Sequence, residues 1–384
     1  MRIFMIGRQL DLMELLSRSS HFLLGPRGSG KSFLIRANCL EAADYIDLLD
    51  SRTYLRLKSD PALLHSLISK PLAVIDEIQR IPELLNEAHR AIETGDKRFL
   101  LTGSSARSLR RQGVNLLAGR AFRAELFPLT WFELSRHGNF DLHRYLRLGG
   151  LPSAFLREHG EDYLYAYVDT YLKEEIQFEG LVRSLPNYTR FLQSAAFNNS
   201  RVLNYAKVAN DAQLPPNTVR DYYQILMDTL IGFQIPPWRG SPTRKFVQTT
   251  KFYLFDPGIV NALRDTRSLD PGSDLFGMAF EHFIACELRA FLSYSRIRLP
   301  LQFWRTRTGR EVDFVIGDEI AIEVKSGKSV SRRDHKGLLT ISQEREWKHL
   351  LVVSSDPANA SFENGIRHEH WETFLRRLWN REYV

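Results

Sequence analysis

The residues with the clearest chemical potential form one short stretch, GPRGSGKS, which runs from Gly25 to Ser32. Glycines at this spacing let successive backbone N–H groups turn inward around an anion, and a helix beginning directly afterwards adds its positive end. The lysine then supplies an ammonium for terminal phosphates, and the hydroxyl after it supplies a ligand for Mg²⁺. The motif predicts a nucleotide-binding loop made by Gly25, Pro26, Arg27, Gly28, Ser29, Gly30, Lys31, Ser32 and Phe33.

The elements around this loop agree with that chemistry. An apolar run, expected to be a strand, reaches Gly25, and a helix is expected over residues 33–40. A glycine turn that joins a strand to a helix without binding a ligand has the same local pattern. Further along, Leu72–Glu77 is an apolar strand that ends in two carboxylates. Asp76 is expected to join Ser32 as a Mg²⁺ ligand, and Glu77 to orient an attacking water.

A third strand, residues 98–102, runs into a polar tip that is followed by several arginines. The order of phosphate loop, acidic strand and polar-tipped strand resembles the AAA+ ATPases. The resemblance implies ATP as ligand and places Thr102 or Ser104 in the sensor position. It also implies a homo-oligomer in which an arginine, Arg120 or Arg107, completes the catalytic site of a neighbouring copy.

Composition bounds the class of protein. The chain has 384 residues, of which 43% are hydrophobic and 25% charged, so two or three globular domains are expected. Its apolar runs are too short to cross a bilayer, and its two cysteines, Cys39 and Cys286, are far apart. We therefore expect a cytoplasmic protein without a disulfide framework. The net charge of +7 is consistent with a polyanion partner such as DNA or with ordinary surface charge.

The middle of the chain reads as helical. A long helix is expected over residues 160–182, with an aromatic stripe typical of core packing. Residues 205–211 and 217–230 then have a helix-turn-helix pattern, which fits either a winged-helix DNA-binding domain or a packing module. The second helix carries Arg220 beside acidic residues, which favours packing because phosphate contacts need basic side chains.

The last segment carries a second set of reactive side chains. Asp313 lies in one predicted strand, and Glu323 and Lys325 lie two residues apart on one face of the next. The two carboxylates could hold Mg²⁺, the lysine could activate water, and Glu281 from a preceding helix could complete the metal shell. This arrangement resembles the PD-(D/E)XK nucleases, although Glu-Val-Lys is also typical of an exposed strand.

Taken together, the chain resembles a prokaryotic AAA-like ATPase family with a C-terminal nuclease-like domain. The expected fold is α/β: a P-loop parallel-sheet domain at 1–150, a helical, winged-helix-like segment at 151–242 and a restriction-endonuclease-like domain at 243–384. The leading hypothesis is a Mg²⁺-dependent ATPase coupled to a DNA-directed nuclease-like module in DNA processing or defence. The alternative is a nucleotide-dependent switch or assembly protein whose last domain only binds DNA or protein.

Overall fold

The computed structural model describes residues 6–95, 97–103, 120–138, 140–172, 182, 184–240, 249–362 and 365–384. The chain divides into two compact units. The first unit extends to Leu129 and includes Asp228–Ile231, and the second comprises Thr130–Met227 and Gly232–Val384.

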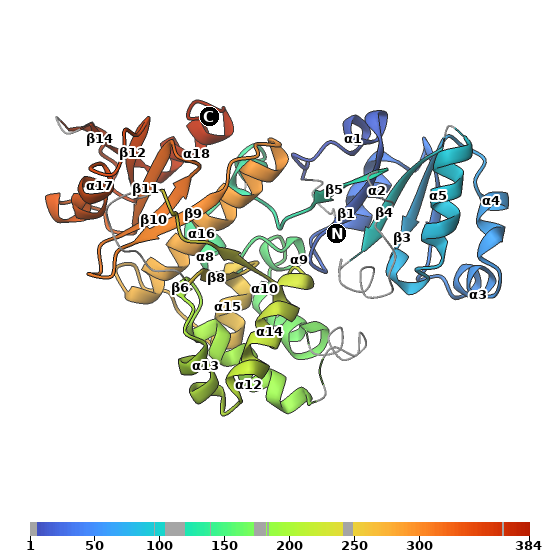
Figure 1. The fold of residues 1–384 in the computed structure, drawn as a ribbon, viewed down its shortest axis with the longest axis horizontal. Coiled ribbons are helices and arrows are strands. Elements are labelled where there is room, and N and C mark those ends of the chain that lie inside the picture. The colour runs from blue at the N-terminus through green and yellow to red at the C-terminus, as the bar shows by residue number, and fades with distance from the viewer. Residues whose placement is uncertain are drawn as a thin grey trace. The chain divides into compact units, whose positions relative to one another are not determined.

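The first unit is built around a five-stranded parallel sheet with the strand order β2-β3-β4-β1-β5 (Figure 1). Its strands are β1 (Ser20–Leu24), β2 (Ala43–Asp47), β3 (Leu72–Asp76), β4 (Arg98–Gly103) and β5 (Ala121–Glu125). Its helices are α1 (Leu12–Arg18), α2 (Lys31–Asn38), α3 (Ser51–Ser59), α4 (Leu64–Leu67) and α5 (Leu84–Thr94), with 3₁₀ turns η1 (Pro61–Leu63) and η2 (Ile78–Arg80). All residues of β1 and β3 are buried, as expected for inner parallel strands. The parallel sheet predicted from the sequence is confirmed.

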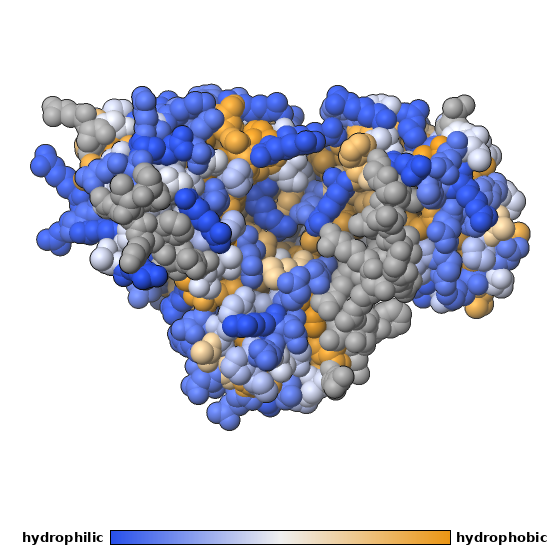
Figure 2. All heavy atoms as spheres, viewed as in Figure 1, coloured by the Kyte–Doolittle hydropathy of each residue, from blue (hydrophilic) through white to orange (hydrophobic). Residues whose placement is uncertain are grey.

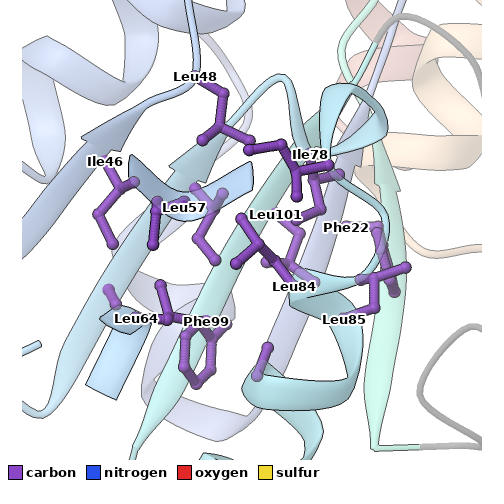
Figure 3. Packing of buried hydrophobic residues seen from close by; sticks show 14 of the residues in the cluster. Phe22, Ile46, Leu48, Leu57, Leu64, Ile78, Leu84, Leu85, Phe99 and Leu101 are labelled. Carbon is purple, nitrogen blue, oxygen red and sulfur yellow. The ribbon is translucent and has the colours of Figure 1, made fainter. Parts of the chain in front are cut away.

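One face of this sheet packs on a closely fitted apolar cluster (Figure 3). Phe22, Phe99 and Leu101 from the strands meet Leu84 and Leu85 of α5. The apolar positions of α5 recur on one side of the helix, so packing them removes that side from water. The cluster fixes the strands whose carboxyl ends carry the candidate site.

The second unit contains a six-stranded mixed sheet, β13-β14-β12-β11-β10-β9, and a small antiparallel sheet, β6-β8-β7 (Figure 1). The strands are β6 (Arg201–Val202), β7 (Gly232–Ile235), β8 (Lys251–Leu254), β9 (Leu301–Arg305), β10 (Glu311–Ile316), β11 (Ile320–Lys325), β12 (His349–Ser354), β13 (Ala360–Ser361) and β14 (Ile366–His370). The helices are α7 (Trp131–Ser135), α8 (Leu142–Leu148), α9 (Pro152–Phe155), α10 (Gly160–Ala166), α12 (Leu185–Phe197), α13 (Tyr205–Ala212), α14 (Pro216–Asp228), α15 (Pro257–Arg264), α16 (Asp274–Tyr294), α17 (Lys336–Ile341) and α18 (Trp371–Trp379), with a π-helical turn η4 (Tyr167–Tyr171) and a 3₁₀ turn η5 (Arg332–His335).

The division between the units lies earlier than the expected boundary at residue 150. The backbone N–H of Trp131 donates to the buried Glu287 carboxylate at 2.6 Å, and that of Gly150 donates to Asp256 at 2.7 Å. These bonds hold the segment after Thr130 against helices from the C-terminal half. The expected boundary at 242 also falls inside a unit, because β8 pairs with β6 and β7 from the middle segment.

The described surface is largely hydrophilic on the face shown in Figure 2, with apolar side chains scattered between charged ones. Among the described residues, no helix combines the length and the apolar character needed to span a bilayer.

Candidate functional site

The loop between β1 and α2 has the backbone that its glycines permit. Gly28 and Gly30 have φ values of 78° and 97°, in the left-handed region that favours glycine. A Cβ at Gly25 would lie 2.4 Å from the carbonyl oxygen of Leu126. A side chain at any of the three positions would therefore strain or displace the turn from which α2 begins at Lys31.

Lys31 is 7% exposed, and its ammonium lies beneath this turn. Its Nζ donates to the carbonyl oxygens of Gly25 at 2.7 Å and Pro26 at 3.2 Å. The ammonium thus contacts neutral acceptors at the N-terminus of a helix. An anion at this position would meet a full positive charge together with the positive end of the helix dipole.

Asp76, at the carboxyl end of β3, receives three hydroxyl groups. Ser32 Oγ and the Tyr45 hydroxyl both donate to Asp76 Oδ2, at 3.0 and 2.5 Å, and the Thr102 hydroxyl donates to Oδ1. Because the carboxylate is 2% exposed, these donors fix its orientation. The structure therefore joins the two predicted Mg²⁺ ligands, Ser32 and Asp76, across 44 residues of sequence.

Glu77 follows directly and has left-handed backbone, with φ of 62°. A residue with a Cβ in this region costs about 1–2 kcal/mol. Its backbone N–H donates to Thr102 Oγ1 at 3.0 Å, and its carboxylate accepts from Gln79 Nε2. The left-handed turn therefore begins directly after Asp76, and its backbone is bonded to the same Thr102 hydroxyl that contacts Asp76.

The remaining predicted residues of the first unit differ in their exposure. Arg120 forms an exposed ion pair with Glu93 at 2.5 Å. Arg27 is exposed, Phe33 is 43% exposed and Pro26 is buried. The fully buried Ser29 hydroxyl lacks a hydrogen-bond partner within the described part of the chain. Ser104 and Arg107 lie outside the described residues.

Two contacts to this site were not predicted from the sequence. Tyr45, on β2, reaches the Asp76 carboxylate, and burial chiefly raises the pKa of its hydroxyl, with Asp76 adding to the shift. Arg8 donates to the carbonyl oxygens of Ser29 at 2.7 Å and Phe127 at 2.5 Å, which ties the phosphate loop to the segment after β5. Neither residue belongs to a recognisable motif.

The predicted C-terminal residues lie on neighbouring elements of the second unit. Residues 314–316 of β10 pair with 320–322 of β11 in the expected hairpin. Asp313 Oδ2 accepts from the backbone N–H of Val324 at 2.9 Å, and Lys325 Nζ contacts Glu323 Oε1 at 2.6 Å. Glu281 of α16 accepts from the Tyr253 hydroxyl at 2.6 Å. The hairpin brings Asp313, Glu323 and Lys325 to one region of the sheet.

A buried lysine that the sequence analysis missed also reaches this region. Lys251 Nζ lies 3.2 Å from Glu281 Oε1, 2.6 Å from Glu311 Oε1 and 3.5 Å from Asp313 Oδ1. Its position as the first residue of an apolar strand gave no signal of this role. Burial raises the pKa of the Glu281 carboxyl to about 7, and it raises that of Glu323, with Asp313 adding to the shift.

Two lysine ammoniums lie among the carboxylates that were predicted to form a metal centre. Within the described ranges, no three or more His, Cys, Asp or Glu side chains are arranged to hold a metal ion. The Lys251 ammonium lies 3.2 Å from Glu281 and 3.5 Å from Asp313. The Lys325 ammonium lies 2.6 Å from Glu323. The positive charge beside these carboxylates therefore comes from lysine side chains.

The middle segment has the predicted helix-turn-helix. Val219, Tyr222, Tyr223 and Leu226 of α14 are all buried, as expected. The Arg220 guanidinium lies 5.2 Å from the centre of the Tyr205 ring, so the one arginine of that helix stacks on its own domain.

Comparisons with known proteins match three segments of the chain. Residues 17–135 match a family described as an AAA domain, and residues 139–270 and 276–371 match two domains of unknown function, DUF8612 and DUF4143. Two uncharacterized proteins, of Mycobacterium tuberculosis and Mycobacterium bovis, are each 27% identical over 89% of this chain and 79% of their own. One from Methanocaldococcus jannaschii is 22% identical over 82% of this chain and 75% of its own.

Among solved structures, the ADP form of the ORC2 protein of Aeropyrum pernix matches with a TM-score of 0.31 and 14% identity, over 65% of this chain and 88% of that one. A TM-score this low says nothing about the fold. The match to the AAA domain spans the phosphate loop, the acidic strand and β4. The first unit is thus similar to AAA-type domains, and this similarity supports a nucleotide-binding P-loop ATPase domain of the AAA+ type.

Proposed function

We propose that the protein is a Mg²⁺-dependent ATPase whose nucleotide site is formed by the loop from Gly25 to Ser32 together with Asp76 and Glu77. The observation that carries the proposal is the contact of Ser32 Oγ with Asp76 Oδ2 at 3.0 Å, directly after the loop that holds Lys31. A glycine turn without a ligand would not require this carboxylate to be buried beside it.

The donor set fits Mg²⁺. A serine hydroxyl and one carboxylate are the hard oxygen ligands that this ion takes from a protein when phosphate oxygens and water complete its octahedral shell. Bound with a nucleotide, Mg²⁺ would offset charge on the phosphates. Ser32 would turn its oxygen from Asp76 towards the ion, and Tyr45 and Thr102 would keep the Asp76 carboxylate in place.

Lys31 and Glu77 supply the remaining chemistry. The Lys31 ammonium can exchange the carbonyls of Gly25 and Pro26 for phosphate oxygens, which carry a full charge. The Glu77 carboxylate would orient the attacking water. Thr102 and Ser104 are the candidates to sense the terminal phosphate, and Thr102 supports this role through its bonds to both Asp76 and the Glu77 N–H.

The resemblance to AAA+ ATPases extends the proposal to a homo-oligomer in which Arg120 reaches the nucleotide of a neighbouring copy. Its pair with Glu93 is exposed on both sides, and surface pairs of this kind contribute at most about 1 kcal/mol. The pair would therefore open readily in an assembly.

The test is phosphate release from ATP by the purified full chain with Mg²⁺, compared with Lys31→Ala. Wild type is expected to release phosphate. Lys31→Ala is expected to lose at least about 100-fold in rate, because it removes the ammonium that would contact the phosphates. A 100-fold loss corresponds to about 2.7 kcal/mol of transition-state stabilisation. Lys58→Ala, an exposed lysine of the same unit, is the matched control. Equal rates in wild type and Lys31→Ala would contradict the proposal.

The C-terminal unit admits two functions. It is either a DNA-directed nuclease-like module controlled by the nucleotide cycle, or a module that only binds DNA or protein while the first unit acts as a switch. The ammonium of Lys251 among Glu281, Glu311 and Asp313 favours the second function, because a metal-dependent nuclease needs those oxygens for its ion.

Incubation with single- and double-stranded DNA, with Mg²⁺ or Mn²⁺, separates the two. Cutting by wild type that is lost in both Asp313→Ala and Glu323→Ala would establish the nuclease. DNA left intact under every condition supports the switch.

A further inference from the structure

The contacts of Lys251 suggest a role for this residue beyond the ATPase site. Lys251 is the first residue of β8, and its side chain is 3% exposed. Its ammonium has three N–H donors, and three carboxylates lie around it at 2.6 to 3.5 Å, those of Glu281, Glu311 and Asp313. The Phe303 ring lies 5.4 Å away and closes another side.

The charges of this group depend on one another. A buried ammonium or carboxylate is costly unless it is paired and hydrogen-bonded. Burial alone would lower the pKa of Lys251, but Glu281 and then Tyr253, Asp313 and Glu311 raise it well above its usual value. The lysine is therefore a permanent cation at neutral pH.

In two of the three carboxylates, the oxygen that is not in contact with Lys251 also has a donor. Asp313 Oδ2 accepts from the backbone N–H of Val324, and Glu311 Oε2 lies 3.3 Å from Arg305. Glu281 Oε1 accepts from Tyr253 as well as from Lys251. A metal ion would have to displace these protein donors in addition to the ammonium.

We propose that the Lys251 ammonium is the resident cation of the carboxylate cluster Glu281, Glu311 and Asp313, and that the C-terminal unit works without a divalent metal there. The lysine supplies in one covalently held group the charge that a metal would supply. This inference does not depend on ATP hydrolysis, since all the residues belong to the second unit.

The proposal has a specific consequence for a chain that lacks the ammonium. Three carboxylate oxygens would then face one point at 2.6 to 3.5 Å, whereas divalent cations bind oxygen at about 2.0–2.6 Å. Shifts of about 1 Å or less would bring the oxygens into that range. Lys251→Ala, which also leaves room for an ion, should therefore create a divalent site that wild type lacks.

The experiment is Mn²⁺ binding to the nucleotide-free full chain, measured by electron paramagnetic resonance and by the unfolding temperature. Lys251→Ala is expected to gain one Mn²⁺ per chain, bound at least about tenfold more tightly than any Mn²⁺ in wild type, and to unfold at least about 3 °C higher with saturating Mn²⁺. Lys251→Met removes the same charge but fills the space, so it should show no gain. Adding Asp313→Asn to Lys251→Ala should remove the new site.

Two outcomes would overturn the proposal. One is a Mn²⁺ bound by wild type and lost in Asp313→Asn, because the cluster would then be a metal site already. The other is a folded Lys251→Ala chain that gains no Mn²⁺. If Lys251→Ala does not fold, the comparison of wild type with Asp313→Asn decides alone: equal Mn²⁺ binding by the two supports the proposal. Because nucleotide is absent, a failure of the ATPase proposal would not affect these results.

Discussion

Each unit of the protein buries a lysine, but the two lysines have different partners. Lys31 donates to backbone carbonyls of a glycine loop, whereas Lys251 is surrounded by three carboxylates. Neutral carbonyls hold an ammonium less strongly than charged oxygens do. In the proposed function the first lysine exchanges these carbonyls for phosphate, whereas the second is a fixed part of its unit.

The two aspartates differ in the same way. Asp76 receives hydroxyl groups from Ser32, Tyr45 and Thr102, which are neutral donors that orient the carboxylate. Asp313 meets the Lys251 ammonium and a backbone N–H instead. In the proposed function the first site takes a cation from solution, whereas in the further inference the Lys251 ammonium is the cation of the second.

The largest expected effect separates binding from chemistry in the first site. Glu77→Gln should lower ATP turnover by about 100-fold or more, since a positioned acid–base group contributes roughly 10²–10⁴-fold. ATP affinity should change by less than about threefold, because Gln keeps the shape of the side chain. Phosphate release and calorimetry measure the two quantities. Glu83→Gln is the control, because Glu83 forms an exposed ion pair with Lys58. Normal turnover in Glu77→Gln would show that Glu77 has no catalytic role.

A second prediction compares the lysines by stability. Removing one partner of a buried ion pair costs about 3–5 kcal/mol, so Lys251→Ala should lower the free energy of unfolding of the second unit by that amount. All six tryptophans lie between residues 131 and 379, so their fluorescence in urea reports this unit. Lys31→Ala, a buried lysine of the other unit, should leave that transition unchanged. If both variants lowered the free energy of unfolding of the second unit equally, the two lysines would not be distinguished by their partners.

A third prediction concerns the support of Asp76. Tyr45→Phe removes a hydroxyl that holds the carboxylate at 2.5 Å. Loss of such a supporting group typically weakens metal affinity by about 10–100-fold, so the Mg²⁺ concentration for half-maximal turnover should rise about tenfold. ATP binding in EDTA should stay the same. An unchanged Mg²⁺ requirement would show that Ser32 and Thr102 suffice.

The last prediction concerns a pH dependence of the second unit. Burial raises the pKa of Glu287 to about 8, although Trp131 and Trp379 donate to it. The unfolded chain releases this proton near pH 4.5, so folding takes up a proton, and this contribution to stability falls as the pH rises from about 4.5 to about 8.

In Glu287→Gln the unfolding temperature, followed by tryptophan fluorescence, should therefore decline less between pH 5 and pH 8 than in wild type. The exposed Glu346→Gln is the control and should follow wild type. The same decline in Glu287→Gln as in wild type would assign the pH dependence to other groups.

The comparison also shows what sequence reasoning can reach. Lys31 and Ser32 were predictable because local spacing defines their loop, and Asp76 because a buried parallel strand must end near the loop at the same sheet edge. Tyr45 and Lys251 were not predictable. Their contacts depend on which strands become neighbours, and no local pattern encodes that choice.

The same reason explains the domain boundaries. The helix α7 has a capping box that Thr130 and Glu133 encode locally, with the Thr130 side chain accepting from the Glu133 N–H. The placement of residues 130–150 in the second unit follows from bonds to Glu287 and Asp256, more than 100 residues later. Pro128 and the glycines near residue 150 are both typical of a break between secondary-structure elements. These residues alone therefore did not show where the first unit ends.

The central claim is that the loop from Gly25 to Ser32 holds the phosphates of ATP. Titration of ATP with Mg²⁺ into wild type and Lys31→Ala, followed by isothermal calorimetry, tests it most directly. We expect saturable binding of one ATP per chain in wild type and none in Lys31→Ala. Wild type that binds neither ATP nor GTP, or Lys31→Ala that binds ATP as tightly as wild type, would contradict the claim.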